Sequence, residues 1–305
     1  MKNTPRNMAA SVHRRLLNIA RASGRPFNEL LQHYAMERYL YRLSKSRYAD
    51  RFILKGALML RVWESPVARP TLDIDLLGRT GNDPEALAAI MKEVCGQPVE
   101  PDGLEFDGST VTSRVITEEV DYAGVRIRFR GRLGTARIVM QIDIGFGDVV
   151  TPEPTETEYP TLLDLPAPRL VAYPRETAVA EKFQVMLSRA QLNSRLRDYY
   201  DVWLLSRGFP FAGELLARAI RKTCEHRETR IVAKPRAFSD EFANDAARQT
   251  QWRAFRRKSM LDHAPAELTE LVHAVREFLG PIAETLAGDR SFTGSWPPSG
   301  PWQPS

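Results

Sequence analysis

The sequence has little cysteine and no long apolar segment, and these two absences narrow the class of protein. Only Cys95 and Cys224 occur among 305 residues, and they lie far apart. This distribution argues against a disulfide framework or a cysteine zinc site and favours a reducing compartment. No apolar run approaches the roughly 20 residues of a membrane helix, and arginines interrupt the N-terminal segment where a signal peptide needs an apolar core. We therefore expect a soluble, cytoplasmic protein without a membrane partner.

Several common catalytic motifs are also absent. The chain has no GxxxxGK loop followed by Ser or Thr, no HExxH, no GxSxG and no GxGxxG after a predicted strand. These absences argue against P-loop, zinc-protease, α/β-hydrolase and dinucleotide-binding chemistry. The contents of 43% hydrophobic and 27% charged residues are ordinary for a globular protein. A net charge of +5 permits a nucleic-acid partner without requiring one.

A strand, a glycine turn and a helix are predicted over residues 52–63, FILKGALMLRVW. The first three residues are apolar and predict a short strand. Gly56 lets the backbone turn without a Cβ in the way. Residues 57–63 then have a helical pattern and lead into a Pro-bounded linker.

The segment TLDIDLL, residues 71–77, predicts a second strand with an acidic face. Alternation with period two places Asp73 and Asp75 on one face and Leu72, Ile74 and Leu76 on the other. Carboxylates one pleat apart repel each other unless a cation lies between them, and magnesium is the typical hard ion held by oxygens. A strand, a glycine turn, a helix and then Asp-x-Asp is the layout of polymerase-β-like nucleotidyltransferases.

Asp143 is the candidate third carboxylate. It lies near the end of the β-prone segment 137–144, between two isoleucines, where a buried acid is costly unless it has a partner. Three carboxylates can hold two magnesium ions that clamp a triphosphate and activate an acceptor hydroxyl for in-line attack. The alternative is that Asp143 and Asp148 only shape the glycine-containing turn at 145–147.

The flanking segments predict further regular structure. Helices are expected at 8–22, 27–43 and 83–95, turns at 97–110, and strands at 111–118 and 122–130. The strand 122–130 has an arginine face that either meets phosphates or is solvated. Four tyrosines of the N-terminal region are expected to pack in the core rather than stack on bases: Tyr34, Tyr39, Tyr41 and Tyr48.

The second half of the chain is predicted to be helical. A helix over 175–190 carries Lys182 near its edge, and a helix over 194–208 carries Asp198 and Asp201, which share a face. Charged helix edges are common, so these signals are weak alone. Helices are also expected at 212–224, 238–258 and 266–287. The basic run 218–236 either lines a groove for acceptor RNA or is a solvated surface, and the tail from Thr293 is expected to be disordered or extended.

Five segments in a fixed order carry a family resemblance: FILKGALML, RPTLDIDLL, MQIDIGFGD, ETAVAEKFQVML and SRLRDYYDVWLL. The chain resembles the AbiEii/AbiGii toxin family, including the MenT-type toxins. The resemblance implies an α/β (α+β) fold, with a polymerase-β-like nucleotidyltransferase core built on a mixed sheet. It also implies the domain order of N-terminal helices (1–50), core (51–165), C-terminal helical lobe (166–292) and disordered tail (293–305).

The resemblance also implies roles for individual residues. Gly56 corresponds to the glycine that lets the triphosphate approach the backbone, and Ala57 stands where relatives usually have Ser or Gly, so only its backbone N–H is available. Thr71 occupies a nucleotide-side hydroxyl position, where phosphorylation would block the site. By the same resemblance, Asp73, Asp75 and Asp143 are the metal ligands, and Lys182 is a catalytic lysine that binds nucleotide phosphate. The essential aspartate of the family is Asp198 or Asp201, of which Asp198 is favoured.

The implied function is that of a toxin in a toxin–antitoxin or phage-defence pair. It would transfer NMP from NTP, with two Mg²⁺ ions, to the 3′ end of tRNA and so block translation, and a cognate antitoxin would be its protein partner. The alternatives are NMP transfer to protein side chains and a non-catalytic binding protein of the same fold. The intact acidic residues and Lys182 argue against the last alternative.

Overall fold

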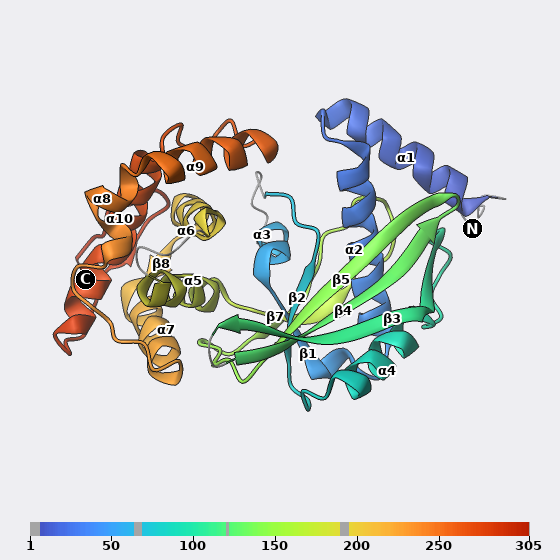
Figure 1. The fold of residues 1–305 in the computed structure, drawn as a ribbon, viewed down its shortest axis with the longest axis horizontal. Coiled ribbons are helices and arrows are strands. Elements are labelled where there is room, and N and C mark those ends of the chain that lie inside the picture. The colour runs from blue at the N-terminus through green and yellow to red at the C-terminus, as the bar shows by residue number, and fades with distance from the viewer. Residues whose placement is uncertain (1–6, 64–68, 120–121, 190–194, 305) are drawn as a thin grey trace. The chain divides into compact units, whose positions relative to one another are not determined.

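The computed structural model describes residues 7–63, 69–119, 122–189 and 195–304, and the chain divides into two compact units (Figure 1). The first unit contains residues 1–64, 70–147 and 155–172. The second contains residues 65–69, 148–154 and 173–305. Most of the linker expected between the first two strands, residues 64–68, lies outside the described residues. No helix among the described residues is long and apolar enough to cross a membrane.

The first unit is built on a seven-stranded mixed sheet with the order β3-β4-β5-β2-β1-β7-β6. β2 runs parallel to β5, β1 runs parallel to β7, and the remaining neighbours are antiparallel. Figure 1 shows β3, β4 and β5 as long neighbouring strands. The predicted α/β fold with a mixed sheet is confirmed. The strands are β1 (Phe52–Lys55), β2 (Ile74–Gly78), β3 (Leu104–Glu119), β4 (Tyr122–Leu133), β5 (Ala136–Phe146), β6 (Thr155–Glu158) and β7 (Arg169–Ala172).

Helices α2 and α4 contribute to the core of this unit. Along β5, Ile138, Met140 and Ile142 are buried with residues of both helices, while alternate residues face away. Asp83 caps α4 by accepting a hydrogen bond from the Ala86 N–H at 2.7 Å. All four tyrosines of the N-terminal region are buried, which agrees with core packing. The predicted helices are confirmed as α1 (Met8–Ser23), α2 (Phe27–Lys45) and α4 (Pro84–Cys95), and α3 (Met59–Val62) follows the short 3-10 helix Gly56–Leu58.

Glu37 is a buried acid on α2. It accepts the Leu162 N–H at 2.7 Å and lies 3.6 Å from an Arg38 nitrogen. Burial is the largest influence and raises the pKa of Glu37 to about 7, although the Leu162 N–H and Arg38 favour the charged form. Glu37 is therefore a titratable group inside the first unit.

Three predictions about the first unit need correction. The expected turn region 97–110 is wrong for residues 104–110, because β3 begins at Leu104 and pairs with β4. An irregularity in register between Asp107 and Thr112 accommodates the polar residues there. Leu72 was expected to share a strand face with Ile74 and Leu76, but it is 69% exposed while those two are buried, since β2 begins only at Ile74. Residues 166–172, which were expected to begin the helical lobe, belong to the first unit because β7 pairs with β1.

The second unit is helical. Residues 238–258 were predicted as one helix, but they form a 3-10 turn, α8 and α9, because Asp245 caps a new helix by accepting the Arg248 N–H at 2.8 Å. Trp252 of α9 is fully buried, as expected for a packing anchor. The helices are α5 (Arg175–Arg189), α6 (Leu196–Gly208), α7 (Gly213–His226), α8 (Asp240–Ala243), α9 (Ala246–Lys258) and α10 (Leu268–Ala287). Residue 190, where the helix carrying Lys182 was expected to end, and the start of the next helix at 194 lie outside the described residues.

The C-terminal segment is extended and packed, so the prediction of a disordered tail is wrong for residues 293–304. β9 (Ser295–Trp296) pairs with β8 (Phe211–Ala212). The Trp296 indole donates to the Ser206 carbonyl at 2.7 Å, and Trp302 stacks on Phe278 with ring centroids 5.8 Å apart. The contacts of the two tryptophans hold this segment in place, although its Pro- and Ser-rich composition suggested disorder.

Candidate active site

Asp73, Asp75 and Asp143 lie together at neighbouring strands of the sheet. Asp75 on β2 is directly opposite Asp143 on the parallel strand β5, and Asp73 immediately precedes β2. Each carboxylate offers an oxygen, and the three oxygens lie within 4.8 Å of one another. Asp143 is buried and the other two are half-buried. The structure therefore brings together the three acids that were predicted as metal ligands.

Gly56 and Thr71 lie directly against two carboxylates of this cluster. Gly56 has φ +74°, and a Cβ built on it would lie 1.9 Å from Asp75 Oδ2. Only glycine therefore allows this close approach. The Thr71 hydroxyl donates to Asp73 Oδ1 at 2.6 Å, so the hydroxyl position predicted near the nucleotide is next to a candidate metal ligand. Ala57 is buried in the 3-10 helix that begins at Gly56.

Arg126 is a member of this cluster that the sequence did not single out. Its Nε donates to Asp143 Oδ1 at 2.7 Å and its Nη2 to Asp143 Oδ2 at 2.6 Å. The arginine face predicted for residues 122–130 is real, and one of its arginines meets a carboxylate of the cluster. The register that pairs Arg126 with Asp143 extends from the two-residue turn at 134–135, so counting back along this hairpin finds the contact.

The cluster fits a divalent metal ion. Its donors are carboxylate oxygens, which magnesium prefers, and the bond length of about 2.1 Å places opposite ligands roughly 4.2 Å apart. The observed spread of up to 4.8 Å needs only a small side-chain movement to reach that geometry. The Arg126 guanidinium pairs with one of the three carboxylates, that of Asp143.

A second cluster lies in the helical unit and includes Lys182. Lys182 Nζ on α5 is 2.9 Å from Asp201 Oδ2 and 3.3 Å from Asp198 Oδ1, and both acids are on α6. Arg69 forms two hydrogen bonds with Asp201, with Nε–Oδ1 at 2.7 Å and Nη2–Oδ2 at 2.9 Å. The Arg69 partner was missed, because nothing local in the sequence connects residues 132 positions apart.

Asp198 and Asp201 on α6 differ in their burial and in their charged partners. Asp201 is 1% exposed and contacts two cations, Arg69 and Lys182, whereas the Asp198 carboxylate contacts Lys182. Burial alone would raise the pKa of Asp201, but Arg69 and Lys182 outweigh it and hold the pKa at about 2. Burial would likewise lower the pKa of Lys182, but Asp201 and Asp198 raise it above its usual value. The lysine is therefore charged at neutral pH.

Part of the predicted basic run 218–236 is committed to internal contacts. Arg227 donates to Asp148 at 2.7 Å and to the Gln184 side chain at 3.0 Å. Asp148 thus pairs within the helical unit, whereas Asp143 lies in the carboxylate cluster. Arg227 therefore fits neither alternative predicted for the run, a groove for RNA or a solvated surface.

Comparison with known proteins identifies the family. The sequence profile described as nucleotidyl transferase AbiEii toxin, type IV TA system, matches residues 38–280. A candidate nucleotidyltransferase of Helicobacter pylori is similar in structure, with 12% identity, a TM-score of 0.45, and coverage of 85% of this chain and 95% of that one. JHP933 of Helicobacter pylori is similar too, with 13% identity, a TM-score of 0.46, and coverage of 86% of this chain and 92% of that one. No curated protein sequence matches. Because the profile spans most of the chain, the protein belongs to the AbiEii family and is a nucleotidyltransferase toxin of a toxin–antitoxin system.

Proposed function

We propose that the protein transfers NMP from NTP to the 3′ end of tRNA and thereby blocks translation. The observation that carries the proposal is the meeting of Asp73, Asp75 and Asp143, with Gly56 placed directly against Asp75. Such a set of oxygen ligands suits phosphoryl chemistry that depends on a divalent metal. An antitoxin partner follows from the family.

The three carboxylates would hold magnesium, and two ions are proposed. Magnesium bound there would polarise the α-phosphate and offset the charge of the triphosphate. Thr71 orients Asp73 through its hydroxyl, and the missing side chain of Gly56 leaves the Asp75 carboxylate in place. Lys182 is proposed to offer its charged amine to nucleotide phosphate, with Asp201 positioning it and Asp198 as the favoured essential acid.

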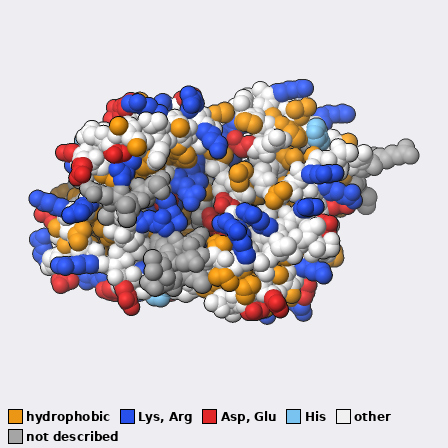
Figure 2. All heavy atoms as spheres, in the orientation of Figure 1, with side chains coloured by type: hydrophobic (Ala, Val, Ile, Leu, Met, Phe, Trp, Pro, Cys, Tyr) orange, Lys and Arg blue, Asp and Glu red, His pale blue; other side chains and the backbone are white. Residues whose placement is uncertain are grey.

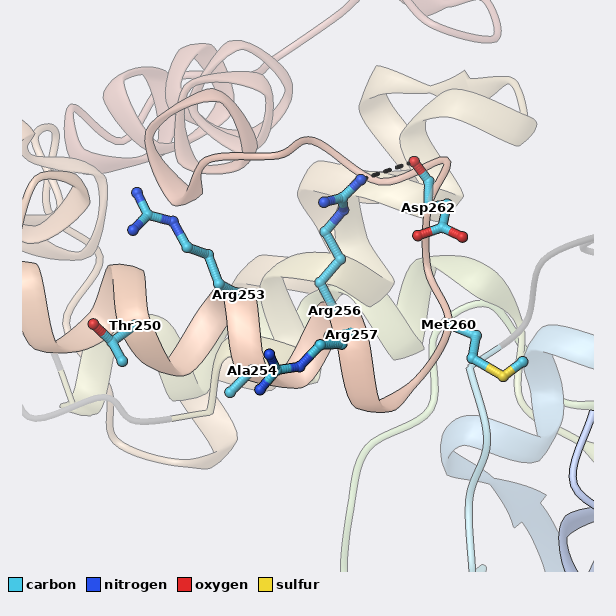
Figure 3. A pocket seen from close by; sticks show the side chains of 7 residues that line it. All are labelled: Thr250, Arg253, Ala254, Arg256, Arg257, Met260 and Asp262. Atoms are coloured by element: carbon cyan, nitrogen blue, oxygen red, sulfur yellow. Dashed lines mark hydrogen bonds between the residues drawn. The ribbon is translucent and has the colours of Figure 1, made fainter.

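The composition of α9 supports a nucleic-acid acceptor. This helix has five Arg and Lys and no Asp or Glu, in a chain whose net charge is +5. Figure 2 shows Lys and Arg spread widely over one face of the molecule. A hollow of about 740 Å³ beside α9 is lined by Arg253, Arg256 and Arg257 (Figure 3).

The arginines of this hollow differ in their availability to a ligand. Arg253 pairs with Glu267 at 2.6 Å, and Arg256 donates to backbone carbonyls of the turn at 261–264. Arg257 and Lys258 are exposed. We call Arg257 and Lys258 the α9 basic surface and propose that it contacts RNA phosphates, since such contacts release counterions.

Labelled nucleotide transfer tests the proposed function. Purified protein is incubated with Mg²⁺, each α-labelled NTP, and either deacylated tRNA or a protein lysate. Label in tRNA that disappears when the 3′ diol has been oxidised by periodate supports the proposal, and Asp73→Asn should abolish it. Label in protein would favour side-chain NMP transfer instead. Absence of any transfer, with equal toxicity of the Asp73→Ala variant, would leave only a binding function.

A further inference from the structure

The Arg126 guanidinium is bound to the carboxylate of Asp143, which is proposed as the third metal ligand. It lies on β4 directly opposite Asp143 on β5, and its guanidinium covers both carboxylate oxygens at 2.7 and 2.6 Å. The side chains are only 22% and 7% exposed, so water screens the pair weakly. Two charge-assisted hydrogen bonds in a fork geometry are among the stronger polar contacts in proteins.

The neighbouring arginine on the same face makes a different contact. Arg128 donates to Gln141 Oε1 at 3.0 and 2.8 Å, and Gln141 Nε2 in turn lies 3.4 Å from Asp143 Oδ2. Arg128 is exposed and binds an amide rather than a carboxylate. It therefore provides a matched comparison, with the same side chain on the same strand two residues away.

The charge of Arg126 opposes metal binding at this cluster. Its guanidinium already offsets the negative charge of Asp143, so a divalent ion gains less from that carboxylate than from one without a bound cation. A divalent ion at the Asp143 oxygens would also repel the guanidinium that is already bound to them. The negative charge of a nucleotide triphosphate would add to the attraction for the metal ion.

We propose that Arg126 is an internal counter-ion that competes with divalent metal for Asp143. It keeps the affinity of the free protein for metal low, so that full metal loading accompanies the triphosphate. This inference rests on the proposed metal site. Replacing Arg126 by a neutral side chain should therefore tighten metal binding by about tenfold, equivalent to about 1.4 kcal/mol.

The test is titration of the full-length protein with Mn²⁺, followed by electron paramagnetic resonance, in the absence of nucleotide. Arg126→Gln should lower the Mn²⁺ Kd about tenfold, while Arg128→Gln should change it less than about twofold. Arg126→Met keeps the aliphatic stem and must shift the Kd in the same direction if the glutamine variant folds poorly. With a non-hydrolysable NTP present, the difference between Arg126→Gln and the unchanged protein should shrink.

The outcomes separate this inference from the proposed function. An unchanged or higher Kd in folded Arg126→Gln and Arg126→Met, with binding still abolished by Asp73→Asn, overturns the counter-ion role alone. An equal gain in affinity from Arg128→Gln also overturns it, because a general charge effect would then explain the shift. If Asp73→Asn leaves Mn²⁺ binding unchanged, the metal lies elsewhere and the proposed metal site itself fails.

Discussion

Gly56 should tolerate no side chain, because its backbone lies against the carboxylate of Asp75. A Cβ at this position would be 1.9 Å from Oδ2 and 2.6 Å from both Cβ and Cγ of Asp75. Rotation of the carboxylate can relieve only the contact with Oδ2, since the Asp75 Cβ itself is too close. Gly56→Ala must therefore shift the backbone of β1 or β2 as well as a candidate metal ligand.

Two contributions set the expected loss of stability in Gly56→Ala. The left-handed backbone, φ +74° at Gly56, costs a residue with a Cβ about 1–2 kcal/mol. The forced displacement adds about 1–3 kcal/mol, which is typical of overpacking a core. Gly24 separates the two contributions, because its φ is +70° and nothing lies within 4 Å of the added Cβ. Gly24→Ala should show the backbone cost alone.

Urea unfolding followed by circular dichroism compares the two variants, and Mn²⁺ titration reports on the site. Gly56→Ala should lose about 1–3 kcal/mol more stability than Gly24→Ala. It should also bind Mn²⁺ at least about tenfold more weakly, because Asp75 is displaced. Equal stability losses, together with an unchanged Mn²⁺ Kd in Gly56→Ala, would refute the close packing of Gly56 against Asp75.

Three further predictions follow from other contacts. Asp201→Asn should lower the free energy of unfolding in urea by about 3–5 kcal/mol, because it removes the buried carboxylate that Arg69 and Lys182 share. Asp198→Asn should lower it by about 1 kcal/mol and mainly reduce nucleotide transfer. Equal losses of stability would contradict the different roles of the two acids. The pKa of Glu37 is about 7 in the folded protein and near 4.5 when unfolded, so the free energy of unfolding should fall by up to about 3 kcal/mol as pH rises through that window. Glu37→Gln should remove this slope, and an identical slope in the variant would assign it to other groups. Charge reversal of both residues of the α9 basic surface should weaken tRNA binding about tenfold in filter assays, while reversal at the exposed Arg14 should not.

The carboxylate cluster could be predicted from the sequence because it follows from strand geometry. Alternation in a strand has a period of two, so TLDIDLL places both acids together wherever the strand begins. Asp143 stood out because a carboxylate between two isoleucines needs a partner. The start of the strand was not predictable with equal accuracy. Leu72 was counted as part of the strand, but β2 begins two residues later and Leu72 is exposed.

Long-range partners could not be predicted in the same way. Arg69 and Asp201 are 132 residues apart, and their contact depends on how the helical unit packs. Arg126 is a different case, because a two-residue turn at 134–135 fixes the register of β4 and β5 and thereby pairs it with Asp143.

The two clusters show that an acid's partners decide what it can do. Asp201 is buried and contacts two cations, so a metal ion would have to displace both. Asp73 is half-buried and accepts a hydrogen bond from the Thr71 hydroxyl. Because a hydroxyl is neutral, this contact does not offset the negative charge of Asp73. Asp143 lies between these extremes, with one guanidinium that a divalent ion can compete against. We therefore propose that Asp201 positions Lys182, that Asp73 binds metal, and that Asp143 binds metal in a way that depends on the triphosphate.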